Sequence, residues 1–560
     1  MTVIKHKSYF LFSKDLYPTS EAKPLSEWCP EMTSEILQEK IDAIQTNLTI
    51  DRKNTTKHKR TLISAPDDRI SARNGDLVYA NYGRIKDFLY LINNKSMDLK
   101  GKTIIARYGK IYRGDKVKNA QRFNASGIIM YTDPSDFNST YPDSWWIPPS
   151  GLQRGPVGPD GDQLTPLYPA TDYAYRVEQS DIENFRIPAQ PISYGDALPI
   201  LRYVPLNFYS YSQNRIWQCT RPDRTIVFCA WGAEEHGLIG SNEWVEEYMK
   251  VLYERAVAYL NVDYAVDYNY VLTAGTSPLL QDSLYEATKM VPNPDTSSRD
   301  KTVYDAWKTR DGSDDVEPSV YYSLGSGSDM ATFYQRAGVP CIDMWFTYDS
   351  KKWDILSYPV YHSAYETVYL YEKFVDPNYA YTKSMAELWG ILAWNIANEK
   401  VLKFDVRRYA SAISTFITSL KKDFGVKWSK ENVNIAALES AAQNLTSEAN
   451  RFHQKLQQKL QHPHKISVLE SRQINDKLIQ FERAFIDCEG LPGRPMYKHV
   501  MFAPSMYDSY SDNSFPGIVD TMNEIENRNA TEKWGILKQQ VSVATFTIQS
   551  AANTLTEVGL

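Results

Sequence analysis

Residues 224–244 read Arg-Thr-Ile-Val-Phe-Cys-Ala-Trp-Gly-Ala-Glu-Glu-His-Gly-Leu-Ile-Gly-Ser-Asn-Glu-Trp, and this stretch decides the fold. Its apolar run, 225–231, is typical of a strand buried on both faces. A helix over 241–255 and a second buried strand over 256–262 follow, so the stretch predicts a βαβ unit of a parallel sheet. Ligands of such sheets bind beyond the carboxyl ends of the strands. We therefore expect the functional site at residues 232–237 and at Asp263.

Upstream of this unit the sequence predicts a smaller domain. Short β-branched runs separated by glycine, with one helix between them, indicate a small mixed α/β domain. The expected strands are 76–80, 102–106 and 127–131, and the expected helix is 115–123. A Pro-, Gly- and Tyr-rich stretch over 141–169 predicts a large ordered surface loop.

The two ends of the chain differ from this central part. Residues 1–75 are polar, with weak periodicity and a basic cluster over 52–60, which predicts a solvated, poorly packed arm. From about Phe404 onward, apolar residues recur at helical spacing, as in Tyr409, Ile413, Phe416 and Leu420. The C-terminal part is therefore expected to be a helical domain.

Composition narrows the class of protein. The 560 residues leave room for about three or four domains, and 42% hydrophobic with 13% aromatic residues argues against disorder. A net charge of −6 offers no overall electrostatic attraction to nucleic acid. No apolar run approaches the ~20 residues that span a bilayer, and the first residues lack the apolar core of a signal peptide. Five scattered cysteines form neither a disulfide framework nor a zinc motif.

The glycosylation acceptor pattern Asn-x-Ser/Thr is frequent, and its use requires passage through the secretory lumen. This favours an extracellular or luminal glycoprotein. The acceptor positions are Asn47, Asn54, Asn94, Asn124, Asn138, Asn444 and Asn529.

The residues that carry chemistry surround the predicted strand ends. Glu234 and Glu235 are adjacent acids, and a pair held in such a loop most simply places one carboxylate on a metal while the other takes a proton from metal-bound water. Asp263 ends the next strand, and His362 follows the hydroxyl of Tyr361. Oxygen and imidazole ligands of this kind suit zinc. Simpler roles remain open: Glu234 and Glu235 as loop acids, Asp263 as a helix cap and His362 as a structural histidine.

The stretch 224–244 resembles the signature of the glutamate carboxypeptidase II (N-acetylated alpha-linked acidic dipeptidase) family of co-catalytic zinc exopeptidases. Similarity runs from about Asp76 to the C-terminus, through the motifs at 105–110, 116–121, 164–170, 358–366, 481–487 and 514–517. The resemblance implies an α/β zinc-exopeptidase fold with a mixed sheet, an inserted protease-associated apical domain and a C-terminal helical dimerisation domain, hence a homodimer. The expected boundaries are 1–75 for a remnant of the protease domain, 76–202 apical, 203–403 peptidase and 404–560 dimerisation.

The resemblance also implies roles for individual residues in the hydrolysis of C-terminal residues of small peptides. Glu234 would be the general base toward a zinc-activated water, and Tyr361 would steady the tetrahedral intermediate. Of the family's two zinc ions per subunit, one would be bound by Glu235 and His362 and the other by Asp263. A structural calcium ion would be held by Glu243, Glu246 and the carbonyls of Thr165 and Tyr168. Substrate contacts would come from Arg113, Ser326, Gly327, Ser328, Tyr361, Ser509 and Tyr510.

The chain departs from the family pattern in one catalytic segment. The family carries a zinc histidine and a bridging aspartate before the strand at Arg224, whereas residues 198–220 here contain no His and no Asp. Two ligands rarely hold zinc tightly. This leaves open a catalytically inactive receptor or scaffold, as the transferrin receptor is within the same fold. It also leaves open a spliced or incomplete product that lacks this segment and the family's membrane anchor, the only expected link to a membrane.

Specificity residues diverge as well. Asp343 and Trp345 stand where glutamate-preferring members carry an arginine patch, and Pro156 and Ser509 replace an amide and a lysine of the carboxyl-side pocket. Arg113 remains able to clamp a terminal carboxylate through two hydrogen bonds. We therefore expect a peptidase of broader or less acidic preference.

Overall fold

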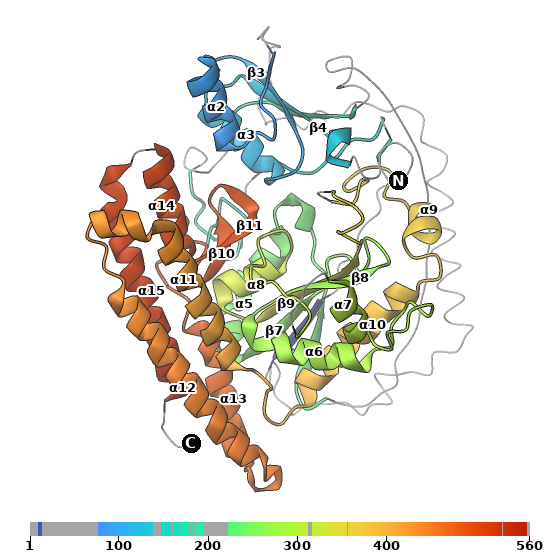
Figure 1. The fold of residues 1–560 in the computed structure, drawn as a ribbon, viewed down its shortest axis with the longest axis vertical. Coiled ribbons are helices and arrows are strands. Elements are labelled where there is room, and N and C mark those ends of the chain that lie inside the picture. The colour runs from blue at the N-terminus through green and yellow to red at the C-terminus, as the bar shows by residue number, and fades with distance from the viewer. Residues whose placement is uncertain are drawn as a thin grey trace.

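The computed structural model describes most of the chain from residue 77 onward, together with one short strand before it (Figure 1). The described residues are 9–13, 77–137, 147–148, 150–158, 161–178, 182, 185–194, 197, 222–311, 316–355, 357–528 and 530–556. The basic cluster at 52–60 and the segment 198–220 lie outside them. So do the acceptors Asn47, Asn54, Asn138 and Asn529.

The peptidase part is built on a five-stranded mixed sheet with the order β6-β1-β7-β9-β8. Strand β7 is buried along its whole length, because its Ala-Val-Ala-Tyr-Leu-Asn sequence places apolar side chains on both faces. It pairs in parallel with β9, with Asn261 opposite Asp343, and β8 runs antiparallel to β9. The strands are β1 Tyr9–Ser13, β6 Thr225–Cys229, β7 Ala256–Asn261, β8 Val271–Thr276 and β9 Cys341–Thr347.

Two expectations about this sheet are wrong. Strand β1 lies between β6 and β7 and is antiparallel to both, so the segment Tyr9–Ser13 belongs to the sheet and is not part of a solvated arm. Strands β6 and β7 therefore run in the same direction without pairing with each other. Nor is β6 buried on both faces: it ends the sheet among the described strands, and Phe228 is 71% exposed. An apolar run predicts burial on both faces only where neighbours flank the strand.

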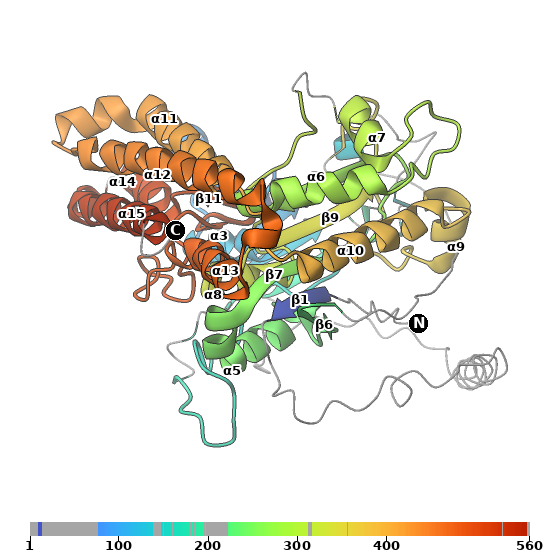
Figure 2. The same ribbon diagram turned by 90° about the horizontal axis from the view of Figure 1, so that it is seen from below.

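Helices cover both faces of this sheet. Helix α6 packs against α10, and α10 also contacts β1, β6 and β9, whereas α5 packs against α8, which contacts β7 and β9. In Figure 2, α6 and α10 lie on the side of the sheet away from α5. These helices are α5 Ile239–Arg255, α6 Gln281–Met290, α8 Met330–Ala337 and α10 Ala380–Asn398, with α7 Val303–Arg310 beside α6. The predicted helix after β6 is confirmed as α5.

The apical part has its own four-stranded parallel sheet, in the order β2-β3-β4-β5. The strands expected at 76–80, 102–106 and 127–131 are confirmed, and the expected helix corresponds to α3. A separate core of Phe88, Ile104, Val117 and Ile128 holds these elements together. They are β2 Leu77–Tyr79, α2 Ile85–Lys95, β3 Thr103–Arg107, α3 Arg113–Arg122, β4 Gly127–Tyr131 and β5 Ala189–Ile192.

The C-terminal part is helical, as its periodicity predicts. Helices α12 and α15 pack along each other, α11 packs on α12, and the part lies beside the peptidase sheet (Figure 1). Its elements are α11 Val406–Lys430, α12 Ala436–Leu460, α13 Val468–Arg483, β10 Phe502–Ser505, β11 Asp508–Ser514, α14 Pro516–Arg528 and α15 Trp534–Leu555. Within the part of the chain that the structure describes, no helix has the length and apolarity to cross a membrane.

Short helical turns complete the connections. They are η4 Pro134–Phe137, η5 Glu234–His236, η6 Pro278–Leu280, α9 Val368–Leu370, η7 Tyr371–Val375, η8 Pro463–Lys465 and η9 Thr531–Lys533. Of these, η5 follows β6 and carries Glu234, the predicted general base, and Glu235, a predicted zinc ligand.

Candidate active site

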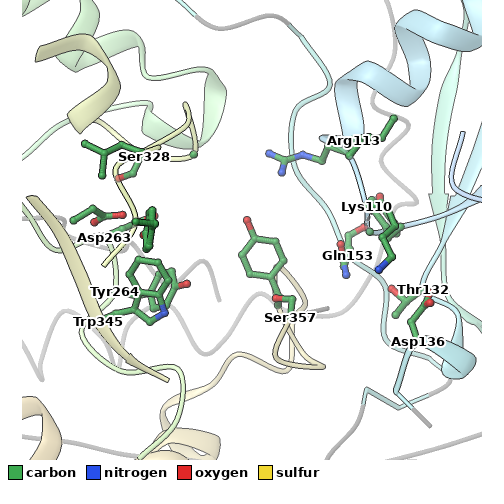
Figure 3. Close-up of a pocket in the computed structure, with 18 of the residues that line it drawn as sticks. Lys110, Arg113, Thr132, Asp136, Gln153, Asp263, Tyr264, Ser328, Trp345 and Ser357 are labelled. Atoms are coloured by element: carbon green, nitrogen blue, oxygen red, sulfur yellow. Dashed lines mark hydrogen bonds between the residues drawn. The ribbon is translucent and has the colours of Figure 1, made fainter. Parts of the chain in front are cut away.

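A cavity of about 760 Å³ lies between the apical part and the carboxyl ends of β7 and β9. Figure 3 shows its two walls facing each other, with Asp263, Tyr264, Ser328 and Trp345 on one side and Lys110, Arg113 and Gln153 on the other. Asp263, Tyr361, Arg113, Gly327 and Ser328, all predicted site residues, line this cavity. The position agrees with the rule that ligands of such sheets bind beyond the strand ends.

The loop after β6 folds back tightly to present Glu234 and Glu235. Ala233, with φ +55°, and Leu238, with φ +60°, adopt left-handed backbone conformations that are uncommon outside glycine. The turn closes where the Gly240 N–H donates to the carbonyl of Gly232 at 3.0 Å. A Cβ on Gly240 would lie 2.5 Å from that carbonyl oxygen, so only glycine fits. The Oε2 atom of Glu234 is inaccessible to solvent.

The structure brings Glu235 and His362, the two predicted ligands of one zinc ion, close together. His362 Nε2 lies 3.1 Å from Glu235 Oε2. The other ring nitrogen, Nδ1, lies 3.0 Å from the backbone carbonyl of Arg154 in the apical part. That carbonyl can only accept, so Nδ1 carries the proton and Nε2 points toward Glu235. A histidine with Nδ1–H on a backbone carbonyl is the arrangement usual for a metal ligand.

The backbone of His362 is held by a third carboxylate. His362 adopts a left-handed φ of +56°, and its N–H donates to Glu366 Oε2 at 2.9 Å. Glu366 also accepts a hydrogen bond from the Tyr358 hydroxyl. The Tyr361 ring stacks on the His362 ring at a centroid distance of 4.0 Å and meets Tyr358 edge-on at 5.5 Å. This small cluster determines where the imidazole points.

The donor set fits zinc only in part. Glu235 and His362 supply two suitable ligands, but catalytic zinc normally keeps three protein ligands. Among the residues described in the structure, no group of three or more His, Cys, Asp or Glu side chains could hold a metal ion. Asp263 lines the cavity without joining such a group, so these residues alone do not complete a zinc site.

The two glutamates predicted to bind calcium, Glu243 and Glu246, lie on α5 and contact the loop over 165–170. The Leu167 N–H donates to Glu246 Oε1 at 3.0 Å, and the Ala170 N–H donates to Glu243 Oε2 at 2.6 Å. Glu243 Oε1 is buried with no hydrogen-bond partner among the described residues, which suits a bound cation. Burial raises the pKa of Glu246 to about 7, although its ion pair with Arg336 opposes the shift.

The carbonyl ligands predicted for calcium belong to the same loop. Thr165 is fully buried, and its carbonyl accepts from the Tyr168 N–H at 3.4 Å. Oxygen ligation of this kind suits Ca²⁺. The Arg336 guanidinium on Glu246 is a competing cation that the sequence did not reveal.

The predicted substrate residues are distributed over four segments, one of which carries Tyr361, described above. Arg113 begins α3, is 8% exposed, and donates from Nε to the Pro156 carbonyl at 2.7 Å. Ser326 and Ser328 are buried, whereas Gly327 between them is exposed. Ser509 and Tyr510 lie on β11, which the structure describes as backbone only.

Sequence reasoning missed several residues of the site. Glu366 and the Arg154 carbonyl orient His362, and Asn261 donates to both Ser328 and Asp343. Tyr264 and Tyr321 line the cavity. Only Glu366 could have been identified from the sequence, since it ends the motif at 358–366. The other residues become neighbours of the site only through tertiary contacts.

Sequence models of three families match the chain. They are Peptidase family M28 over residues 206–370, the PA domain over 73–157 and the transferrin receptor-like dimerisation domain over 433–556. The order agrees with the predicted apical, peptidase and helical parts. The boundaries predicted for those parts stay predictions.

Individual relatives are similar to most of the chain. A probable glutamate carboxypeptidase of Arabidopsis thaliana is 32% identical over 83% of this chain and 76% of its own. The aminopeptidase NAALADL1 of Rattus norvegicus is 29% identical over 86% of this chain and 77% of its own. A solved zinc aminopeptidase from Bacillus subtilis covers 59% of this chain and 76% of its own, at 14% identity and a TM-score of 0.32, too low to support an argument.

The family matches and the geometry of the candidate site point to the same class of protein. The adjacent glutamates, the oriented histidine and the cavity at the strand ends lie within a chain whose relatives are exopeptidases by name. The protein therefore belongs to the glutamate carboxypeptidase family of M28 peptidases, with a PA domain and a transferrin receptor-like dimerisation domain.

Proposed function

We propose that this chain is a metallo-exopeptidase that removes the C-terminal residue of small peptides, with Glu234 as the general base. The observation that carries the proposal is the approach of His362 Nε2 to Glu235 Oε2 at 3.1 Å. Glu235 directly follows Glu234 in the chain, and His362 directly follows Tyr361, which lines the cavity. A general base must lie within reach of the proton that it takes. The tight turn that ends at Gly240 holds Glu234 at the strand end for this role.

The other residues have roles that follow from their positions. Arg113 on the apical wall receives the terminal carboxylate of the peptide, because a guanidinium forms paired hydrogen bonds with it. The Tyr361 hydroxyl donates to the oxygen that becomes negative as water attacks, and Ser326–Ser328 lie along the peptide backbone. Zinc, when bound by Glu235 and His362, supplies a Lewis acid for the scissile carbonyl.

The second candidate is a non-catalytic receptor or scaffold. It is favoured by one observation: the described residues assemble two zinc ligands and not three. A chain of this kind would keep the three-part architecture and the oriented histidine, but would not hold zinc tightly enough for catalysis.

Metal analysis and hydrolysis together distinguish the two. The full chain is purified in buffer with zinc and assayed for bound metal and for amino-acid release from dipeptides. Close to two zinc ions per chain with hydrolysis supports the peptidase. Glu234→Gln should then lower kcat by about 10²–10⁴, while the matched variant Glu247→Gln, on an exposed position of α5, should retain it. No bound zinc and no hydrolysis would support the scaffold.

We also propose a structural calcium ion at Glu243 and Glu246, completed by the carbonyls of Thr165 and Tyr168. The buried, unpartnered Oε1 of Glu243 supports it. Added Ca²⁺ should raise the thermal midpoint of the native chain, and Glu243→Gln should abolish that increase. An equal increase in both would refute the site.

Assembly and location follow from the same family. The match to the transferrin receptor-like dimerisation domain supports a homodimer formed through residues 404–560. A secretory location is supported by two acceptors in the structure, Asn94 and Asn124, which are exposed. Asn444 is half-buried on α12 and donates to Gln549 at 3.3 Å, so it is the poorer acceptor. Light scattering tests the dimer, and glycosidase treatment of the secreted chain tests the glycans.

A further inference from the structure

The sheet-side wall of the cavity carries a buried carboxylate among aromatic rings. Asp343 on β9 is only 7% exposed and lines the cavity. The Trp345 ring centroid lies 5.6 Å from that of Tyr264 and 6.4 Å from that of Tyr321. All three rings also line the cavity. We call Asp343, Tyr264, Tyr321 and Trp345 the aromatic wall.

The carboxylate of this wall is oriented by its neighbour in the sheet. Asn261 stands opposite Asp343 in the β7–β9 ladder. Its Nδ2 donates to Asp343 Oδ1 at 2.7 Å and to Ser328 Oγ at 3.0 Å. Burial, and after it the nearby Asp343 carboxylate, raises the pKa of Tyr321. The wall therefore combines negative potential with neutral aromatic rings.

The opposite wall carries two cationic side chains, Lys110 and Arg113, together with the carboxylates of Asp133 and Asp136. Lys110 and Arg113 face Tyr264 and Trp345 across the cavity (Figure 3). Arg113 is held in place by its hydrogen bond to the Pro156 carbonyl and by close packing on Gly155, where a Cβ would lie 2.4 Å from Nε. A ligand with a carboxylate at one end and a cation at the other would match both walls.

We propose that the aromatic wall binds a positively charged group of the peptide substrate, either a basic side chain or the free amino terminus, while Arg113 holds the carboxylate. The inference rests on the proposed exopeptidase function and names its substrate class. Aromatic faces attract ammonium and guanidinium groups, and a hydrogen bond between charged groups is stronger than a neutral one. An acidic side chain on the amino side of the cut would be repelled by Asp343.

Equilibrium binding tests this without relying on catalysis. The full chain carrying Glu234→Gln, so that no peptide is cleaved, is titrated calorimetrically with acetyl-Lys-Ala, acetyl-norleucine-Ala, norleucine-Ala and acetyl-Glu-Ala. Norleucine has the four-carbon side chain of lysine without its terminal ammonium group. We expect at least one of the two cationic peptides, acetyl-Lys-Ala for a side chain or norleucine-Ala for the amino terminus, to bind about tenfold more tightly than acetyl-norleucine-Ala.

Variants locate the preference within the cavity. Asp343→Asn keeps an acceptor for Asn261 but removes the charge, so the preference should fall to about one. Asp133→Asn makes the same change on the apical wall and should leave the preference intact. Trp345→Leu, which keeps the carboxylate, should reduce the preference severalfold and serves as the test if Asp343→Asn does not fold.

The outcomes separate this inference from the proposed function. Equal binding of charged and neutral peptides, tighter binding of acetyl-Glu-Ala, or no binding of any peptide would overturn the cation site. A retained preference in a native chain that hydrolyses nothing would support the cation site and refute the peptidase. Hydrolysis without any preference would do the reverse.

Discussion

Removing the Glu366 carboxylate should displace His362 although Glu366 does not itself reach the cavity. Glu366 accepts hydrogen bonds from the His362 N–H, at 2.9 Å, and from the Tyr358 hydroxyl. Tyr358 is buried, and His362 has a left-handed backbone that needs external support. Glu366→Ala leaves both donors unsatisfied.

The size of the effect follows from these two bonds. Each hydrogen bond to a charged group contributes about 1.5–3 kcal/mol. Glu366 is half-buried, so solvent offsets part of this, and we expect the free energy of unfolding to fall by about 2–4 kcal/mol. A residue that orients a metal ligand typically affects metal affinity or activity by about 10–100-fold, and we expect that loss in kcat/KM here.

The assay pairs unfolding with metal binding and hydrolysis. Glu366→Gln retains one carbonyl acceptor for the His362 N–H and should recover most of the activity. Glu372→Ala is the matched control, because Glu372 accepts from the Tyr379 hydroxyl at 2.9 Å, a similar bond within the 371–379 segment. If Glu366→Ala lost stability but kept zinc affinity and kcat/KM, or if Glu366→Gln were no better than Ala, the positioning role would be refuted.

Three further predictions test other parts of the structure. Burial raises the pKa of Asp267 from 3.8 to about 8, so the stability that its protonation provides is complete below about pH 4 and is lost as the pH rises to about 8. The free energy of unfolding of Asp267→Asn should lack this decline. Parallel pH profiles of the native chain and the variant would contradict the assignment. Gly240→Ala forces a Cβ against the Gly232 carbonyl, so it should cost about 1–3 kcal/mol and lower peptide hydrolysis, and unchanged urea unfolding would show that the turn adapts. Phe546 on α15 is 72% exposed, and Phe546→Glu should shift the dimer toward monomer in light scattering. The thermal midpoint at low protein concentration should not change. An unchanged molecular mass would place the dimer interface elsewhere.

Much of the fold was predictable because local patterns are strong there. The β-branched strands of the apical part, helix α5 after β6 and the amphipathic C-terminal helices all follow from side-chain periodicity. The pairing of strands did not, since β1 comes from residues that are far away in the sequence and enters between β6 and β7. Hydrophobic periodicity states which faces are buried, but not which neighbour buries them.

The candidate site divides in the same way. By itself, the sequence determined the chemical groups: adjacent carboxylates after a strand, a histidine beside a tyrosine, and the family to which they belong. Only the tertiary structure decided that Glu235 and His362 meet, that an apical carbonyl selects the tautomer of His362, and that Tyr264 and Trp345 face Lys110 and Arg113 across one cavity. The reason is physical, because residue types determine which interactions are available, whereas the distances and relative burial that set their strength exist only after distant segments have packed together.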